Sequence, residues 1–375
     1  MKRLIYIFFA AVILFYSCSE ISVDPMPNIN GVPVMDILID HYDYIALLSN
    51  KTTDFETYCK FSFEGKLYDA IISSSGAGSR YSDKWAFKIE LLDEQTINGL
   101  NEFSLSSQTF DQSGFHNVIA SHIFRKLGFP VFKSRHVFVK VNGKDQGLYP
   151  MIERVEDEFF ESRNLKAAEL FKLGFDSKFT FRETNNVQFF FEKKIPDDNN
   201  FNSLIEFIHA VDTSKSTKLE NSLGGFLDIQ NYLKYHAAAS LINNVDGFTN
   251  NFFLWKENPN APFKIIPWDF DKAFTGSANG SLAGFNQIAV KLFSNDNLLN
   301  DYKNLLVYYN ENLLNETELF PIIDSTATII RDAYKRDPYL GKAGYNLDDE
   351  IQKLKNYILQ RNKFIKENAH AFKGF

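Results

Sequence analysis

Four side chains that carry oxygen ligands stand close together in the sequence: Asp246, Asn251, Asp269 and Asp271. Asp246 and Asn251 lie in the segment INNVDGFTNN with four residues between them, and the other two flank a single phenylalanine in PWDFDKAF. Carboxylate and amide oxygens are hard ligands, which suit Mg²⁺ or Mn²⁺ rather than zinc. The histidines are scattered without the spacing of zinc ligands. These residues therefore predict a magnesium or manganese site.

The elements around the four residues decide whether they can meet. An amphipathic pattern at 229–245 predicts a helix that leads to Asp246, and two short apolar strands joined by a Pro/Asn turn are predicted between Asn251 and Asp269. Such a hairpin returns the chain, so Asp269 should enter the same pocket as Asn251. Taken alone, an Asp and an Asn at this spacing are better explained as turn and capping residues, so the order of the elements carries the prediction.

The rest of the sequence divides into two parts. From about residue 36 to 155, alternating segments predict strands on both sides of Glu64-Gly65, in KWAFKIELL, and on both sides of the hairpin turn Asn142-Gly143, with one helix in GFHNVIASHIFRKLGFP. From 156 to 375 we expect amphipathic helices at 201–210, 229–245, 296–315 and 348–370. The predicted class is α+β, with a strand-rich N-lobe at 36–155 and a mainly helical C-lobe at 156–375.

The order of these features is that of a protein kinase: a strand-rich lobe with one helix, then Asp-x₄-Asn, strand, turn, strand and Asp. In that order the first Asp orients the acceptor hydroxyl or accepts its proton, while the Asn and the last Asp hold magnesium against the nucleotide phosphates. The segments VNGKDQGLYPMIERV, INNVDGFTNNFFLWKENPNAPFKIIPWDFDKAF and LKNYILQRNKFI resemble the CotH kinase family, atypical secreted or surface kinases related to spore-coat protein H. The resemblance extends from about residue 70 to 366 and implies a single two-lobed, atypical protein-kinase-like domain.

The resemblance also implies a role for each matching residue. Asp246 matches the catalytic aspartate, and Asn251, Asp269 and Asp271 match the metal ligands, although Asp271 could instead cap the next turn. ATP with Mg²⁺ or Mn²⁺ is implied as the cofactor, and a protein serine or threonine hydroxyl as the acceptor.

Four further residues are expected on the nucleotide side of the site. Arg80 and Lys84 match a basic stretch of the family, and Lys84 and Lys88 are expected on one face of the same strand, from which either could reach a phosphate. For Lys88, a solvent-facing position on an edge strand is an equally good explanation. Glu153, in MIERV, matches an acidic residue near the connection between the lobes.

Two positions depart from the family pattern. Ser75 stands where the family has an arginine before a glycine, and His116 replaces the arginine of D-x-S-x-x-R-N. Loss of these basic groups could weaken phosphate binding or mark an inactive relative. The alternative function is thus an exported lipoprotein that uses an inactive kinase-like fold to bind a protein or a glycan. A carbohydrate-active enzyme with Asp269 and Asp271 as acid and nucleophile ranks last, because adjacent acids on one turn rarely span a sugar.

Charge and the N-terminal segment restrict the location and the partners. The formal net charge of -7 disfavours nucleic acid as a partner. The start MKRLIYIFFAAVILFYSCSE has the basic residues and short apolar run of a secretory signal. Cys18 resembles the lipidated cysteine of a bacterial lipoprotein, with an ordinary signal peptide as the alternative. We expect a signal peptide at 1–18, a tether at 19–35, and an exported protein that a lipid anchors in the outer membrane of the bacterial cell envelope.

Overall fold

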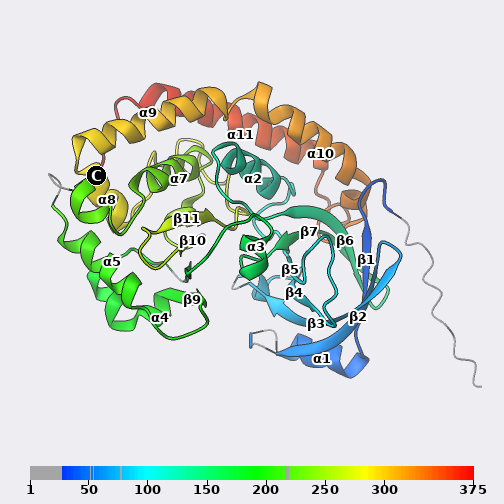
Figure 1. The fold of residues 1–375 in the computed structure, drawn as a ribbon. Helices are drawn as coiled ribbons and strands as arrows, with labels where there is room; N and C mark the ends of the chain where they lie inside the picture. Colours follow the sequence, from blue (N-terminus) through cyan, green and yellow to red (C-terminus); the bar gives the residue numbers. More distant parts are fainter. Residues whose placement is uncertain (1–27, 51, 54, 77, 175, 216–218) are drawn as a thin grey trace, which may run out of the picture.

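The computed structural model of the chain describes residues 28–50, 52–53, 55–76, 78–174, 176–215 and 219–375. The predicted α+β class is confirmed, because strands dominate up to Glu153 and helices dominate the remainder (Figure 1). The expected signal peptide and Cys18 lie outside the described residues. Within the described part of the chain, no helix is both long enough and apolar enough to cross a membrane.

The N-terminal part is a closed β-barrel. Its strands follow one another around the barrel in the order β1-β2-β3-β4-β5-β7-β6, and β1 closes it by pairing in parallel with β6. Because β4 lies between β3 and β5, Lys88 is not on an edge strand. The strands are β1 (Val34–Leu38), β2 (Glu56–Phe63), β3 (Lys66–Ser75), β4 (Ala86–Leu91), β5 (Glu102–Leu105), β6 (Ser134–Val141) and β7 (Lys144–Glu153).

The turns and the helix predicted for this part are present. Glu64-Gly65 joins β2 to β3 and Asn142-Gly143 joins β6 to β7, and all four residues have the positive φ that such tight turns require. Helix α2 (His116–Lys126) ends just before Gly128, as the stop signal predicts. Strand β1 begins at Val34, slightly earlier than expected, so the expected tether at 19–35 overlaps the barrel. The remaining helical elements here are α1 (His41–Ser49) and η1 (Ser79–Tyr81).

The C-terminal part contains a sheet with the strand order β11-β10-β8-β9. The predicted hairpin forms its β10–β11 edge, with Phe253 opposite Ile266. Strands β8 and β9 were not predicted from the sequence, because both are short and β8 joins the hairpin through a non-local pairing with β10. The strands are β8 (Glu169–Leu173), β9 (Phe191–Ile195), β10 (Phe252–Lys256) and β11 (Lys264–Pro267).

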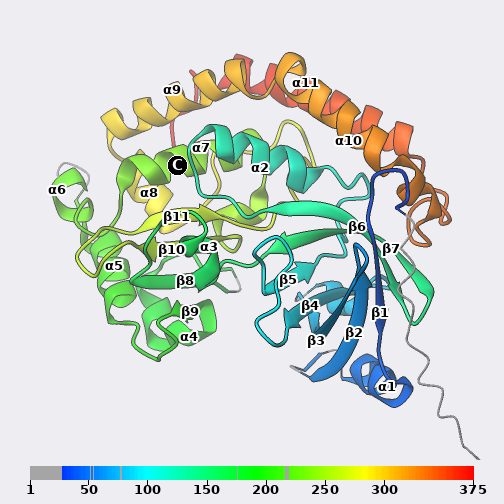
Figure 2. The same cartoon turned by 45° about the vertical axis from the view of Figure 1, so that its right-hand side comes forward.

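Helices cover this sheet and extend over the barrel. The four predicted helices correspond to α5, α7, α9 and α11, whereas α10 was missed, because Pro321 interrupts its pattern near the start. Figures 1 and 2 show α9, α10 and α11 as a curved layer along one side of both parts. The helical elements are α3 (Asp157–Glu161), η2 (Phe181–Asn186), α4 (Val187–Phe190), α5 (Asn202–Thr213), α6 (Leu219–Leu223), α7 (Ile229–Leu241), η4 (Val245–Phe248), α8 (Gln287–Phe293), α9 (Asp296–Asn312), α10 (Glu316–Arg336) and α11 (Leu347–Asn368).

Candidate active site

Asp246 lies in the short turn η4 that links α7 to β10. Its backbone carbonyl accepts hydrogen bonds from the backbone N–H groups of Asn250 at 2.9 Å and Asn251 at 3.1 Å, which closes the loop. Its carboxylate is partly exposed and forms an ion pair of 2.6 Å with the ammonium group of Lys272. The loop therefore holds an acidic side chain at a surface that a substrate can reach.

The hairpin β10–β11 brings Asn251 and Asp269 together, as the sequence predicts. The Trp268 N–H donates to the carbonyl of Asn251 at 3.2 Å, so the two strands still pair at this end of the hairpin. The side-chain nitrogen of Asn251 donates to the carbonyl of Asp269 at 3.2 Å. Asp269 itself has φ of +51°, so the chain turns sharply after β11. Asn251 and Asp269 thus lie on neighbouring segments of the backbone, from which both side chains can serve one site.

The carboxylates of Asp269 and Asp271 lie in an environment that disfavours their negative charge. Burial raises the pKa of Asp269, the nearby Lys172 ammonium opposes this effect, and Asp246 adds to it. Burial, together with repulsion from Asp269 and Asp111, raises the pKa of Asp271 to about 8. A cation bound between the two carboxylates would offset this repulsion.

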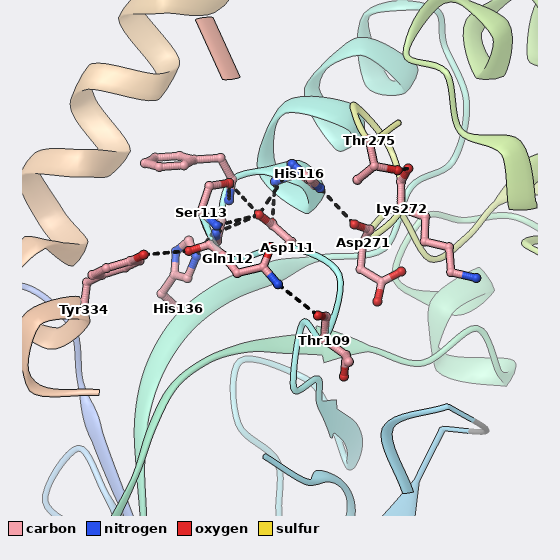
Figure 3. Close-up of polar contacts among 12 residues, drawn as sticks. Thr109, Asp111, Gln112, Ser113, His116, His136, Asp271, Lys272, Thr275 and Tyr334 are labelled. Atoms are coloured by element: carbon pink, nitrogen blue, oxygen red, sulfur yellow. Dashed lines mark hydrogen bonds and ion pairs between the residues drawn. The ribbon is translucent and has the colours of Figure 1, made fainter. Parts of the chain in front are cut away.

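The loop that carries Asp271 is tied to the start of α2 (Figure 3). The Nδ1 atom of His116 lies 2.9 Å from the carbonyl oxygen of Asp271. On its other side, the His116 ring faces the Asp111 carboxylate, which also accepts hydrogen bonds from the N–H groups of Ser113, Gly114 and His116. His116 therefore fixes the Asp271 backbone, while the Asp271 carboxylate points away from it (Figure 3).

Lys84 does not lie beside these acids in the structure. Its buried ammonium group donates to Asp337, just after α10, at 2.8 Å and to the carbonyl of Leu148 at 2.6 Å, and it lies 4.5 Å from the centre of the Tyr149 ring. The expectation that Lys84 and Lys88 share a strand face fails, because β4 begins only at Ala86 and Lys84 turns toward Asp337. Asp337 and the Leu148 carbonyl thus take two of the three N–H donors of this ammonium group.

Lys88 faces carboxylates on its own strand and on two other strands of the barrel, β2 and β5. Its ammonium group lies 3.5 Å from Glu102, 3.6 Å from Glu90 and 3.9 Å from Glu56. The side chain is about a quarter exposed. Its positive charge is therefore already offset by neighbouring acids.

Glu153 and Arg80 occupy different environments. Glu153 is buried at the end of β7, where its carboxylate forms an ion pair of 2.6 Å with Arg163 and accepts a hydrogen bond of 2.7 Å from the backbone N–H of Lys133. Both partners make it a structural link at the lobe connection. Arg80 lies in η1, directly after β3, and is partly exposed. Nucleotide binding by either residue stays a prediction.

Comparison with known proteins decides the family. The sequence model described as CotH kinase protein matches residues 72–365. The chain belongs to the CotH kinase family. Inner spore coat protein H of Bacillus subtilis is 24% identical to it over 358 residues, which cover 92% of this chain and 99% of that relative. Among solved structures, the crystal structure of the Helicobacter pylori proinflammatory kinase CtkA matches 76% of this chain and 93% of its own, with 14% identity and a TM-score of 0.33.

Two lysines near the acids of this CotH-family chain were missed by the sequence analysis. Lys272 directly follows Asp271 and pairs with Asp246, so its position beside the motif was an available signal. Lys172 lies in β8. Among the charged side chains it has the largest effect on the pKa of Asp269: its ammonium group lowers that pKa, whereas burial raises it. No signal in the sequence pointed to Lys172, because β8 was not predicted and lies far from Asp269 in the chain.

Proposed function

We propose that this protein is a kinase that transfers the γ-phosphoryl group of ATP to a serine or threonine hydroxyl of a protein outside the cytoplasm. The observation that carries the proposal is the meeting of Asp246, Asn251 and Asp269 at one end of the β10–β11 hairpin. Membership in the CotH kinase family supports it.

The donor set fits a magnesium or manganese ion that arrives with the nucleotide. Within the described ranges, no group of three or more His, Cys, Asp or Glu side chains is arranged to hold a metal ion. Mg²⁺ is commonly bound by one or two carboxylates together with substrate phosphates and water. Asn251, Asp269 and Asp271 supply an amide oxygen and two carboxylates, so we assign the ion to these residues. The bound ion would neutralise charge that develops on the β- and γ-phosphate oxygens.

Asp246 is proposed to align the acceptor hydroxyl. The hydroxyl oxygen forms a bond with the γ-phosphorus while the bond from that phosphorus to the β–γ bridging oxygen breaks, and ADP leaves. The hydroxyl proton passes to the Asp246 carboxylate. Lys272, at 2.6 Å from Asp246, holds that carboxylate in place before the acceptor arrives. Positioning and electrostatics supply almost all catalysis in this reaction.

The location outside the cytoplasm rests on the N-terminal sequence. The basic start and short apolar run before Cys18 support export, and we propose that lipidation of Cys18 anchors the protein in the outer membrane. The relative from Bacillus subtilis is named as an inner spore coat protein, which supports a surface location.

Incubation of the purified protein with radiolabelled ATP and Mg²⁺ tests the function, first through autophosphorylation and then with candidate acceptor proteins. Asp246→Ala should lower transfer at least about 100-fold while MgATP still binds. Asp269→Ala should abolish transfer and also the stabilisation by MgATP, which for ligand at about 100 times its dissociation constant is about 2.7 kcal/mol. Asp301→Ala, at an exposed position on α9, is the matched control and should change neither property. A folded Asp269→Ala protein with full activity would contradict the proposal.

The alternative is an exported binding module that retains the fold without the activity. The Lys272–Asp246 ion pair favours it, since the proposed catalytic carboxylate already has a partner. The absence of an arginine at positions 75 and 116 favours it as well. A wild-type protein whose melting temperature does not respond to ATP with Mg²⁺ or Mn²⁺ would decide for this alternative.

A further inference from the structure

Lys172 lies on the same face of the C-terminal sheet as the proposed metal ligand Asn251. In β8, Lys172 stands directly opposite Phe253 of β10. Asn251 precedes Phe253 by two residues, which is the period that returns a side chain to the same face of a strand. The hydrogen bond from the Trp268 N–H to the Asn251 carbonyl shows that the register of β10 and β11 continues as far as Asn251. The non-local pairing of β8 with β10 thus places a cation beside the acidic site.

A row of alternating charges leads from the barrel to this lysine. It crosses from β4 and β5, past the end of β7, to β9, where Glu192 stands opposite Lys172. Its ion pairs join Lys88 to Glu102 at 3.5 Å, Glu102 to Arg154, Arg154 to Glu156 at 3.2 Å, Glu156 to Lys194 at 3.5 Å and Lys194 to Glu192 at 2.8 Å. Each basic residue of the row before Lys172 therefore has an acidic partner at contact distance.

Lys172 differs from the other cations of the row. Among the described residues, its ammonium group has no hydrogen-bond or ion-pair partner, although the side chain is partly buried. Burial lowers its pKa, and the charges of Glu192 and Asp269 only partly oppose this effect. An ammonium group that is partly withdrawn from water and has no partner favours an incoming anion.

We propose that Lys172 binds the phosphate chain of the nucleotide, opposite the metal ligands Asn251 and Asp269. This inference rests on the proposed function and names the lysine that serves it. A lysine ammonium is a compact charge that suits phosphate oxygens. Lys84 and Lys88 are less suitable, because Asp337 neutralises the first and a group of glutamates neutralises the second.

Nucleotide binding by charge variants of the purified full-length chain tests the inference. Lys172→Met removes the charge and keeps the length of the side chain, and it should weaken MgATP binding about 10- to 100-fold, the range of a hydrogen bond to a charged group. Lys172→Arg keeps the charge and should restore most of the affinity. The matched control is Lys194→Met, on the same sheet face but already paired with Glu192, and it should change affinity less than about threefold. Because Lys172 has no described partner, its removal should not lower the melting temperature.

Covalent labelling identifies the lysine directly. An ATP analogue with an acyl group on its γ-phosphate reacts with a nearby lysine: the amine attacks the acyl carbonyl, an amide forms and ATP leaves. Peptide mapping should find the amide on Lys172, and excess MgATP should suppress it. ATP-protected labelling of Lys84 or Lys88 without Lys172, or a folded Lys172→Met protein with wild-type affinity, would overturn the inference and leave the proposed function intact. If the wild-type protein binds no MgATP and no lysine is protected, both the proposed function and the inference are wrong.

Discussion

Asp337 ties the C-terminal helices to the barrel, and its replacement gives a sharp test of the role of Lys84. The carboxylate is buried, and its Oδ2 atom accepts hydrogen bonds from the Lys84 ammonium at 2.8 Å and from the Leu148 N–H at 2.7 Å. Its Oδ1 atom accepts from the N–H groups of Tyr339 at 2.7 Å and Leu340 at 3.0 Å. Asp337→Asn preserves the shape of the side chain but leaves the buried Lys84 amine without its counterion.

The expected destabilisation follows from this geometry. Removing one partner of a buried ion pair costs about 3–5 kcal/mol, because the other charge stays buried. For a domain of this size, the melting temperature should fall by on the order of 4–7 °C. Lys84→Met should cost less, about 1–3 kcal/mol, since three backbone N–H groups still bind the Asp337 carboxylate. The double variant should recover part of the loss, which a double-mutant cycle measures as the coupling of the two residues.

Thermal unfolding and MgATP binding, measured on the same variants, separate the two roles of Lys84. The control is Lys60→Met, which breaks an exposed pair with Asp69 at 3.1 Å and should cost less than about 1 kcal/mol. If Lys84 is structural, Lys84→Met lowers the melting temperature and binds MgATP with near wild-type affinity wherever it is folded. A Lys84→Met protein with unchanged stability and lost MgATP binding would refute this reasoning and make Lys84 the phosphate contact.

Three shorter predictions test other parts of the structure. Gly147→Ala should destabilise the protein strongly in a melting experiment, because a Cβ atom there would lie 2.1 Å from Oδ2 of Asp337 and φ is +109°. Burial lowers the pKa of His236 to about 3, so the unfolded chain takes up a proton near pH 6.5 that the native protein refuses. Stability must then fall as pH falls from about 6.5 toward 3, by up to about 1.4 kcal/mol per pH unit, and His236→Gln should flatten this dependence in denaturant titrations. His116→Ala removes the contact with the Asp271 carbonyl. The variant should bind MgATP more weakly in a metal-dependent assay, while its melting temperature stays close to that of the wild type.

Local signals explain the parts of the fold and the site that the sequence predicts well. The turn Asn142-Gly143 and the alternation around Glu64-Gly65 act within one hairpin, so the pattern alone determines the pairing. The same holds for Asn251 and Asp269, which the β10–β11 hairpin joins without help from distant residues. Closure of the barrel by β1 and β6 joins residues about a hundred positions apart, and no local pattern encodes it.

The lysines show where prediction from sequence ends. The alternation of polar and apolar residues predicted that Lys84 and Lys88 share one face of a strand. The partner of Lys84 is instead Asp337, which lies 253 positions away. Lys172 could not be found, because its importance comes from the pairing of β8 with β10. A charged residue next to a motif can be read from the sequence, whereas a charge supplied by a distant strand can only be found in the folded chain.

The distribution of cations bears on whether a histidine at position 116, where the family resemblance implies an arginine, is compatible with the proposed kinase activity. His116 binds the backbone of Asp271, so it maintains the loop that an arginine could otherwise support. The positive charge near Asp269 comes instead from Lys172 and Lys272, both of which lower its pKa against the effect of burial. Phosphate binding needs a cation in the pocket rather than a cation at one particular sequence position. The departure at 116 is therefore compatible with an active kinase in which the C-terminal part supplies the charge.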